Sequence, residues 1–499
     1  MLCGAAGIEV RAATPASLPY VPSVSARNHL QRLADEAGLA LPLTQWPLPA
    51  QAVREALDEL PADLPDALAA ARDALRRDLA RAAQADARLQ LRSRKEAPVG
   101  FGDNYMPGTT AALHTSELSG AAAMPSWLDA RLGVRIEQAP VSDALDLSAP
   151  ATTTRATWRL DDSALVAQAL GLNLQLSATP HWWGPGWQSS LILGNNTPQW
   201  IAFGVQRASA RAPTTPWLAW VGPWSFEFFV AKARDPAVVA QQPTGFLMSG
   251  LRLSFKPHPQ VEVGLSRTIQ TDGEGRPGGV RNFLRAFFGT GLNADTAAQA
   301  AVDPANEMAG YDLRVSCGRA RRCAFYGQMI GEDQAGILPS KFLGLFGVEA
   351  WSADGAQRWY AEYANTYCGG VPGKHTEGNC AYRNGHYQQG YTNGTRWSGA
   401  SQGPDSRLLT LGWLSADGEQ LLRAHIGRVG VSLGAYVPGI ADPPHGKLLG
   451  LQAQRSYALG PIKLTPAFAW TQLSQGADIG NLLRRRNLQL GVQAQWTLP

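Results

Sequence analysis

The first part of the chain, residues 25–85, carries apolar residues at the spacing of α-helices. Leu30 and Leu33 begin this pattern, and Gly38 ends its first segment. A proline-rich connector at residues 41–49 leads to two further helical patterns. About 60 residues of this kind predict a small helical bundle, which is marginally stable alone and therefore docks on the rest of the chain.

After about residue 88 the period of the pattern changes to two, as in β-strands. Within residues 127–137, Leu132, Val134 and Ile136 alternate with charged neighbours such as Arg135. Similar alternation is found in residues 165–179, 251–256, 261–266, 462–471 and 488–496. Strands with one apolar and one polar face occur in half-buried sandwiches. They also occur in membrane barrels, where lipid contacts the apolar side and water fills the lumen.

Three features favour the membrane barrel. Residues 163–206 contain no Asp, Glu, Lys or Arg, whereas a soluble sheet of that length normally exposes several charges. The polar faces consist largely of Gln, Asn, Ser, Thr, Gly and Arg, which suits a wet lumen. Aromatic residues cluster near segment ends, as interfacial girdles require. The clusters are Trp182, Trp183, Trp187, Trp200, Trp217, Trp220 and Trp224, and Trp359, Tyr360, Tyr363 and Tyr367.

The pattern therefore predicts a mainly β fold, a closed transmembrane antiparallel β-barrel preceded by the helical bundle. The sheet has to close because every backbone ladder group must find a partner in lipid. The roughly 410 residues after position 88 can supply about 16 to 20 tilted strands of about ten residues each.

Composition agrees with this fold and excludes several others. Apolar residues make up 45% of the 499 residues, but no run approaches the roughly 18 to 20 needed for a membrane helix. Only 17% of residues are charged, while Gly (52) and Trp (16) are plentiful. The net charge of +4 gives no electrostatic signature of nucleic-acid binding.

The cysteines form two closely spaced pairs, Cys317 with Cys323 and Cys368 with Cys380, and Cys3 stands apart. Two loop-closing disulfides are favoured, with a metal site or free thiols as the alternatives. Disulfides would indicate an oxidising compartment such as a periplasm. The start of the chain looks like the tail of a leader, so residues 1–24 are expected to be a leader remnant or an extended segment.

Several unusual segments occur in a fixed order along the chain. They are HWWGPGW at 181–187, WVGPW at 220–224, GEGRP at 273–277 after SRTIQ, FYGQMIGED at 325–333 with LPS at 338–340, and YQQGY at 387–391. Together with LPLTQWPL at 41–48, they resemble the Wzi capsule-assembly family. The resemblance implies an outer-membrane barrel of about 18 strands over residues 88–499 and a periplasmic helical bundle over residues 25–87.

The resemblance also implies a function. Members would bind capsular polysaccharide and anchor it at the surface of a Gram-negative cell, as lectin-like proteins without enzymatic activity, metal or other cofactor. The implied partners are the polysaccharide, outer-membrane lipid and the capsule export machinery. The barrel pattern equally permits an outer-membrane porin or sugar channel, which remains the alternative.

The Gly-rich, aromatic loop from Cys368 to Asp405 contains the side chains suited to gripping sugar. Aromatic faces stack on pyranose rings, and arginine or lysine binds hydroxyls and carboxylates. A second interpretation is that this loop folds into the barrel mouth as a plug. The candidate polysaccharide-binding residues are Lys374, Tyr382, Arg383, Tyr387, Tyr391, Arg396 and Trp397.

Two adjacent carboxylates, Glu332 and Asp333, do not indicate a glycosidase. Neighbouring residues on a strand point to opposite faces, so these two cannot flank one glycosidic bond. Glu332 is expected instead to pair with arginines in the lumen.

Overall fold

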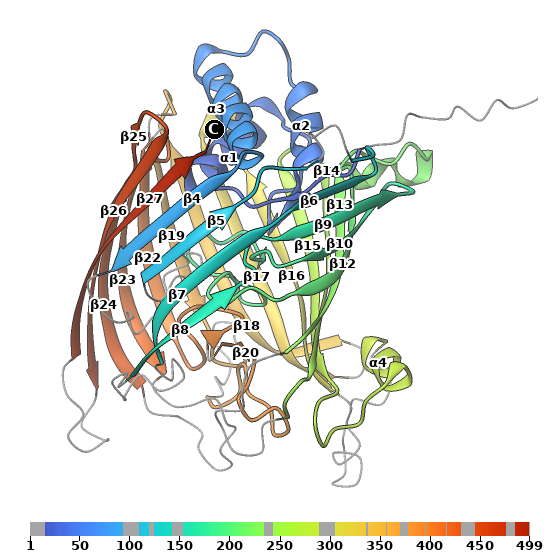
Figure 1. Ribbon diagram of the computed structural model, residues 1–499, viewed down its shortest axis with the longest axis vertical. Helices are drawn as coiled ribbons and strands as arrows, with labels where there is room; N and C mark the ends of the chain where they lie inside the picture. The colour runs from blue at the N-terminus through green and yellow to red at the C-terminus, as the bar shows by residue number, and fades with distance from the viewer. Residues whose placement is uncertain are drawn as a thin grey trace, which may run out of the picture.

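The fold is a ring of antiparallel strands with three helices over one end, as seen in a computed structural model of the chain (Figure 1). The structure describes residues 15–92, 109–118, 124–141, 153–233, 243–288, 305–335, 338–355, 357–369, 378–394, 396–415, 417–430, 445–475 and 485–498. Over these ranges, no helix combines the length and the apolar character needed to cross a bilayer.

The strands of the ring pair mostly with their neighbours in sequence. In chain order they are β4 Asp86–Arg92, β5 Thr109–His114, β6 Leu128–Arg131, β7 Gly133–Val141, β8 Thr153–Arg159, β9 Ala164–Ala169, β10 Leu172–Ser177, β12 Ala202–Arg207, β13 Trp224–Lys232, β14 Leu247–His258, β15 Val261–Thr271, β16 Ala305–Ser316, β17 Cys323–Ala335, β18 Leu338–Trp351, β19 Gln357–Asn365, β22 Arg407–Ser415, β23 Gln420–Gly430, β24 His445–Arg455, β25 Tyr457–Leu459, β26 Ile462–Gln475 and β27 Arg485–Thr497. The last strand, β27, pairs with β4, and β9 pairs with β10, so the strand order returns to its start.

The two faces of the wall are reversed relative to a soluble sheet. On β7, Val134 and Ile136 are 37% and 58% exposed, whereas the neighbouring Arg135 and Glu137 are only 5% and 1% exposed. Apolar side chains therefore point outward and charged ones point into the ring. Because exposed aliphatic residues are stable only against an apolar surrounding, this arrangement is typical of a lipid-facing wall.

One strand prediction is wrong in detail. The segment 165–179 contains the hairpin of β9 and β10 rather than a single strand, and the chain leaves the wall after Ser177. The turn consists of Leu170 and Gly171, whose φ angles are 52° and 77°. Gly171 adopts this left-handed conformation without steric cost, and the apolar alternation on either side hides the reversal. The other predicted strand segments lie in strands of the ring, 127–137 in β6 and β7.

Three helices lie at the end of the ring where the C-terminus also lies (Figure 1). They are α1 Val24–Ala37, α2 Ala50–Asp58 and α3 Asp66–Ala82. The Ser23 side chain caps α1 by accepting a hydrogen bond from the Ala26 N–H, and Gly38 ends it in a left-handed conformation. The helices share one apolar core, to which Trp182 from inside the ring also contributes.

The connector between α1 and α2 joins the helices to the inside of the ring. Its β2 (Gln45–Trp46) pairs with β11 (Trp182–Trp183) from the lumen. Its β3 (Leu48–Pro49) pairs with β1 (Pro19–Tyr20), which precedes α1. The helices are therefore docked on the lumen and do not form a separate body.

The girdle prediction is correct for some aromatic residues and wrong for others. Trp217 and Trp220, in the 3₁₀ helix η1 (Pro216–Val221), are exposed, as are Trp359 and Tyr363. The side chains that the prediction misplaced are buried: Trp182, Trp183, Trp187, Trp200, Tyr360 and Tyr367. Four of these tryptophans belong to residues 178–201, which leave the wall and fold into the lumen, so their apolar character reflects a protein core rather than lipid.

Candidate functional site

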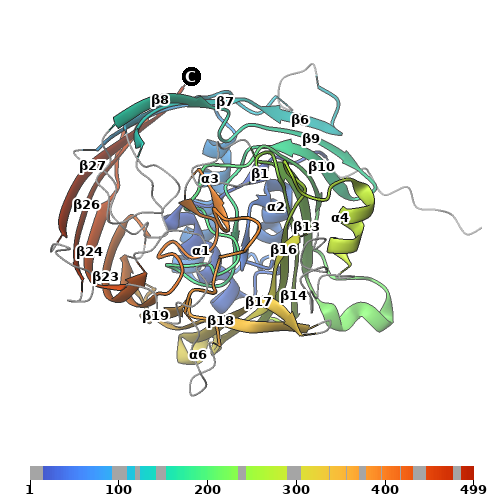
Figure 2. The same ribbon diagram turned by 90° about the horizontal axis from the view of Figure 1, so that it is seen from below.

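In the described part of the chain, two inserted segments lie in the lumen. They are residues 178–201 between β10 and β12, and residues 366–369, 378–394 and 396–406 between β19 and β22. The second includes β20 (Thr392–Asn393) and β21 (Arg396–Trp397), and Figure 2 shows it in orange within the ring. Each segment leaves and rejoins the wall at adjacent positions. Ser177 faces Ala202 across its strand pair, and the Thr366 N–H donates to the Ser406 carbonyl at 2.8 Å. The wall therefore continues past both insertions.

The second segment is cross-linked near its base. A disulfide joins Cys368 to Cys380 within this segment. Another disulfide joins Cys317 to Cys323 between β16 and β17, so both pairings expected from the spacing are confirmed. Arg383 donates to Asp405 at 2.7 Å and to the Asn379 side chain at 2.6 Å. Asp405 also accepts the Asn379 N–H at 2.7 Å. These bonds close the loop into a compact unit.

The aromatic residues of this loop hold the two inserted segments together. The Tyr382 ring lies 6.0 Å, between centroids, from the rings of both Tyr391 and Trp397. The Tyr382 hydroxyl donates to the Leu191 carbonyl at 2.7 Å, and the Tyr391 hydroxyl donates to the Ile192 carbonyl at the same distance. Because buried hydroxyls with good partners favour one arrangement, the two segments interlock.

The structure brings six of the seven candidate residues together in this loop, but it buries most of them. Tyr382, Tyr387, Tyr391 and Trp397 are enclosed by protein, so no ring face is open for a sugar to stack on. Arg383 is held by Asp405, while Arg396 is partly exposed and donates to the Asn196 carbonyl at 2.7 Å. Lys374 lies outside the described residues. The placement corrects the expectation for the four rings and agrees with the interpretation of the loop as a plug.

Among the described residues of the loop, the tip at residues 384–388 is the most open part, where Gly385 is exposed and Asn384, His386 and Gln388 are partly so. The turn containing the GEGRP motif lies beside this tip. The Tyr387 hydroxyl donates to the Asp272 carbonyl at 3.0 Å, and the Arg276 guanidinium lies 5.9 Å from the centre of the Tyr387 ring. The tip at residues 384–388 and the turn at residues 273–277 therefore form one polar surface.

Buried carboxylates on the wall hold the first inserted segment. Glu362 of β19 accepts the Trp187 N–H at 2.6 Å and the Ser189 N–H at 2.8 Å. The same carboxylate accepts the Tyr326 hydroxyl at 3.1 Å, and the Trp183 indole N–H donates to Glu227 at 3.2 Å. A buried carboxyl group that accepts several N–H groups fixes this irregular backbone in the lumen.

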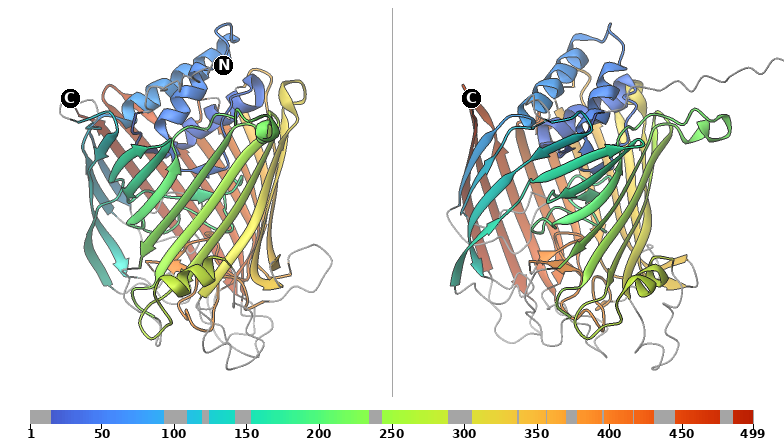
Figure 3. Two further views of the ribbon diagram at one scale, coloured as in Figure 1. Left: turned by 90° about the vertical axis from the view of Figure 1, so that its right-hand side faces the viewer. Right: turned by 45° about the vertical axis from the view of Figure 1, so that its right-hand side comes forward.

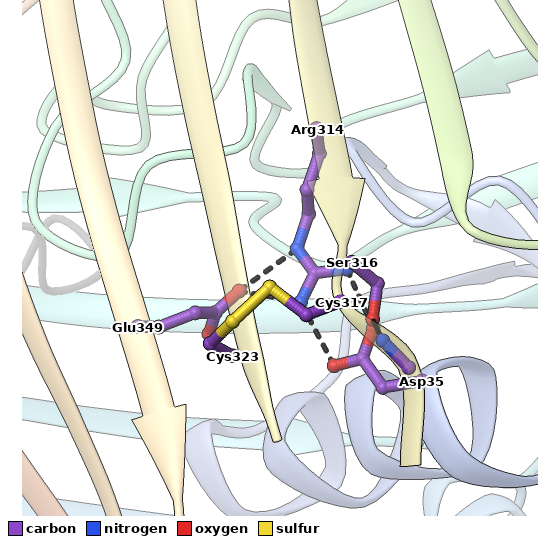
Figure 4. Close-up of a disulfide and its surroundings, with 7 residues drawn as sticks. Asp35, Arg314, Ser316, Cys317, Cys323 and Glu349 are labelled. Carbon is purple, nitrogen blue, oxygen red and sulfur yellow. Dashed lines mark hydrogen bonds and ion pairs between the residues drawn. A yellow bond between two sulfur atoms is a disulfide. The ribbon is translucent and has the colours of Figure 1, made fainter. Parts of the chain in front are cut away.

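A buried ion-pair network attaches α1 to the wall. Arg314 of β16 lies between Asp35 of α1 and Glu349 of β18, as Figure 4 shows, with nitrogen–oxygen distances of 2.7 Å to Asp35 and 2.8 Å to Glu349. Arg358 extends the network by donating to Glu349 at 2.6 Å and to the Asn28 side chain at 2.9 Å. The sequence predicted ion pairs between Glu332 and lumenal arginines, which stays a prediction, and it did not single out this network around Glu349.

Arg27 of α1 reaches into the lumen and contacts the HWWGPGW segment. Its guanidinium donates to the Gly186 carbonyl at 2.6 Å and lies 4.2 Å from the centre of the Trp187 ring. Burial lowers the pKa of Arg27 to about 10, against the opposing effect of Glu349 and Glu362. The group therefore stays charged at neutral pH and makes a cation–π contact within the lumen.

Comparison with known proteins assigns this architecture to a family. The model of the family described as capsule assembly protein Wzi matches residues 82–417, more than half of the chain. The chain belongs to the Wzi family. A Klebsiella pneumoniae protein described as an uncharacterized 55.8 kDa protein in the cps region is 36% identical over 201 residues, which are 39% of this chain and 37% of that protein.

A solved member of the Wzi family has a similar fold. The Escherichia coli Wzi structure is 21% identical and superposes with a TM-score of 0.75 over 97% of this chain and 99% of that one. That protein is described as an outer-membrane protein involved in group 1 capsule assembly and as a carbohydrate-binding β-barrel.

Proposed function

We propose that this Wzi-family chain binds capsular polysaccharide and anchors it at the outer surface of a Gram-negative outer membrane, without catalysing a reaction. Family membership supports this role, as does the description of E. coli Wzi as carbohydrate-binding. The observation that carries the proposal is the plug in the lumen, where residues 178–201 interlock with the described part of residues 378–406. An anchor needs a rigid surface for sugar and no passage for solutes, whereas a porin or sugar channel needs an open lumen.

The proposed wall is a closed barrel of eighteen strand positions. The ring has 21 labelled strands. Three pairs of consecutive strands each occupy a single position in the wall, namely β6 with β7, β8 with β9, and β24 with β25, which leaves eighteen positions. The chain's C-terminus and most of the short turns between strands lie at the helical end. Bacterial barrels have this polarity, so the helical bundle of residues 25–87 is assigned to the periplasm.

The proposed sugar surface is the tip of the plug. Asn384, His386 and Gln388 offer polar groups there, and Arg276 beside Tyr387 offers positive charge, while Arg396 and Lys374 belong to the same loop. The buried tyrosines and Trp397 support this surface from below. Positive charge favours acidic polysaccharide, and salt should weaken that part of the affinity. At the other end, the helices are the proposed contact for the capsule export machinery.

Deleting the gene is expected to leave capsular polysaccharide synthesised but released into the medium. The reason is that an anchor acts after synthesis and export. The measurement is the amount of polysaccharide in the cell pellet and in the culture supernatant, compared with the intact strain and with a strain complemented by the full chain. Equal cell-bound polysaccharide in deleted and intact strains would contradict the anchoring role.

Changing the plug tip is expected to weaken sugar binding without unfolding the protein. His386→Ala combined with Gln388→Ala removes two partly exposed polar groups, and we expect affinity for purified capsular polysaccharide to fall about tenfold. Surface plasmon resonance with immobilised full-length protein would measure this change. The control is Arg319→Ala with Arg321→Ala, on an exposed turn at the helical end. If the tip variant and the control bind equally well, the sugar surface lies elsewhere.

A further inference from the structure

A short amphipathic helix, α4 (Val280–Phe287), lies against the outer wall at the end opposite the three N-terminal helices (Figures 1 and 3). Its inner face packs on the wall. The Phe287 ring makes an edge contact with Phe228 of β13 at 5.8 Å between centroids, and Ala286 is buried beside Ile269 and Ala305. The helix is therefore part of the folded wall and not a loose extension.

An ion pair on the outward face of the wall lies beneath this helix. Arg267 shares its face of β15 with the exposed Leu265, and Glu307 shares its face of β16 with the exposed Tyr311. Arg267 pairs with Glu307 and donates to the carbonyl of Ala286 at 3.0 Å. Charges on a lipid-facing surface are costly. The helix shelters this pair, and the pair in turn satisfies a carbonyl at the C-terminal end of the helix.

The other face of α4 is apolar and turned away from the wall. Val280, Leu284 and Phe288 recur every four residues and are 76%, 45% and 70% exposed. Arg281 and Arg285 flank this apolar stripe, and together the five side chains line one shallow surface. The helix contains no acidic residue. An apolar stripe bordered only by cations is complementary to a lipid monolayer, which offers acyl chains beside anionic headgroups.

We propose that α4 is embedded in the outer leaflet of the membrane, where its apolar stripe contacts acyl chains and Arg281 and Arg285 bind the phosphate of an anionic lipid. The proposal rests on the proposed location in the outer membrane but is independent of polysaccharide binding. The helix is continuous with lipid-facing side chains such as Leu265 on the same wall. It therefore fixes the depth and tilt of the barrel at this end.

Binding of a phosphorylated lipid tests the arginines. Full-length protein in detergent micelles is titrated with diphosphoryl lipid A or with zwitterionic phosphatidylethanolamine, and bound lipid is counted by native mass spectrometry. Each basic residue at a membrane surface contributes roughly fivefold in affinity. Arg281→Gln with Arg285→Gln is therefore expected to weaken lipid A binding about 20-fold and to leave the weak phosphatidylethanolamine binding unchanged.

The matched control carries the same loss of charge at the other end of the barrel. Arg319→Gln with Arg321→Gln removes two exposed arginines from a turn without an apolar stripe, and its lipid A affinity should equal that of the unmodified protein. Equal affinity in the α4 variant and the control would overturn the proposed phosphate site.

Depth of insertion is tested separately and leaves the arginines in place. A spin label is attached at Leu284→Cys in a Cys3→Ser background, and the protein is placed in phosphatidylethanolamine nanodiscs containing lipid A. The label is expected to be more accessible to oxygen than to a water-soluble nickel chelate. The reverse order would place α4 in water and overturn the proposal. Neither result bears on the retention of capsule, which the gene deletion measures.

Discussion

Replacing Arg314 with methionine is expected to destabilise the protein by about 3–5 kcal/mol, the cost of removing one partner from a buried charge pair. Methionine fills a similar volume but leaves Asp35 and Glu349 facing each other without a cation between them. Both carboxylates are almost fully buried, so water cannot replace the lost hydrogen bonds. Because Asp35 lies on α1 and Glu349 on the wall, the helices should loosen before the ring unfolds.

Two measurements would follow this change. Urea unfolding in detergent micelles gives the loss of stability, and limited proteolysis shows whether α1–α3 become accessible before the strands. Arg319→Met is the control, because it removes an exposed arginine from the nearby turn. Adding Asp35→Asn and Glu349→Gln to Arg314→Met should recover part of the loss, since the repulsion then disappears. A change below about 1 kcal/mol would mean that the network does not attach the helices.

The wall of the ring could be predicted from the sequence because its pattern is local. A strand alternates between lipid and lumen at every residue, so Val134, Arg135 and Ile136 already carry the information about their faces. The helical segments were equally readable, since Leu30 and Leu33 mark a buried face and Gly38 marks an end. Each of these signals lies within a few residues of the element it specifies.

The contents of the lumen could not be predicted in the same way. Residues 178–201 contain four tryptophans and no Asp, Glu, Lys or Arg, a composition that serves a lipid-facing girdle and a protein core equally well. Trp182 and Trp187 became core residues because the chain leaves the wall after Ser177, and only tertiary contacts with Arg27 and Glu362 reveal this. The turn at Leu170–Gly171 was hidden by regular alternation on both sides.

The candidate site was likewise predictable where its signals are local and not where they depend on tertiary contacts. The sequence correctly singled out the Cys368 loop as one unit rich in aromatic residues and arginines, and its two cysteines are bonded. Residue type alone did not reveal whether Tyr382 presents its ring to sugar or its hydroxyl to the Leu191 carbonyl. The network around Arg314 was missed because Asp35 lies 279 positions away in the chain, beyond the reach of any local pattern.

Removing both inserted segments is expected to turn a non-conducting protein into a channel. The full chain should give no steady single-channel current in planar bilayers, because interlocked segments lie in its lumen as a plug. Residues 179–200 and 367–405 can each be replaced by a two-residue turn, since their ends lie on adjacent wall positions. This change also removes Trp182 and Trp187, on which Arg27 of α1 packs. A barrel of this size without a plug leaves an aqueous channel, so steady current steps should appear.

The variant that lacks only residues 367–405 is the informative intermediate. Residues 178–201 then keep their bonds to Glu362 and Glu227, so we expect only brief, irregular openings. Because the wall strands are unchanged in all three proteins, differences in current report on the lumen alone. A large and steady current through the full chain would contradict the filled lumen and favour the porin function. Silence of the doubly shortened, folded protein would show that the helices alone close the barrel.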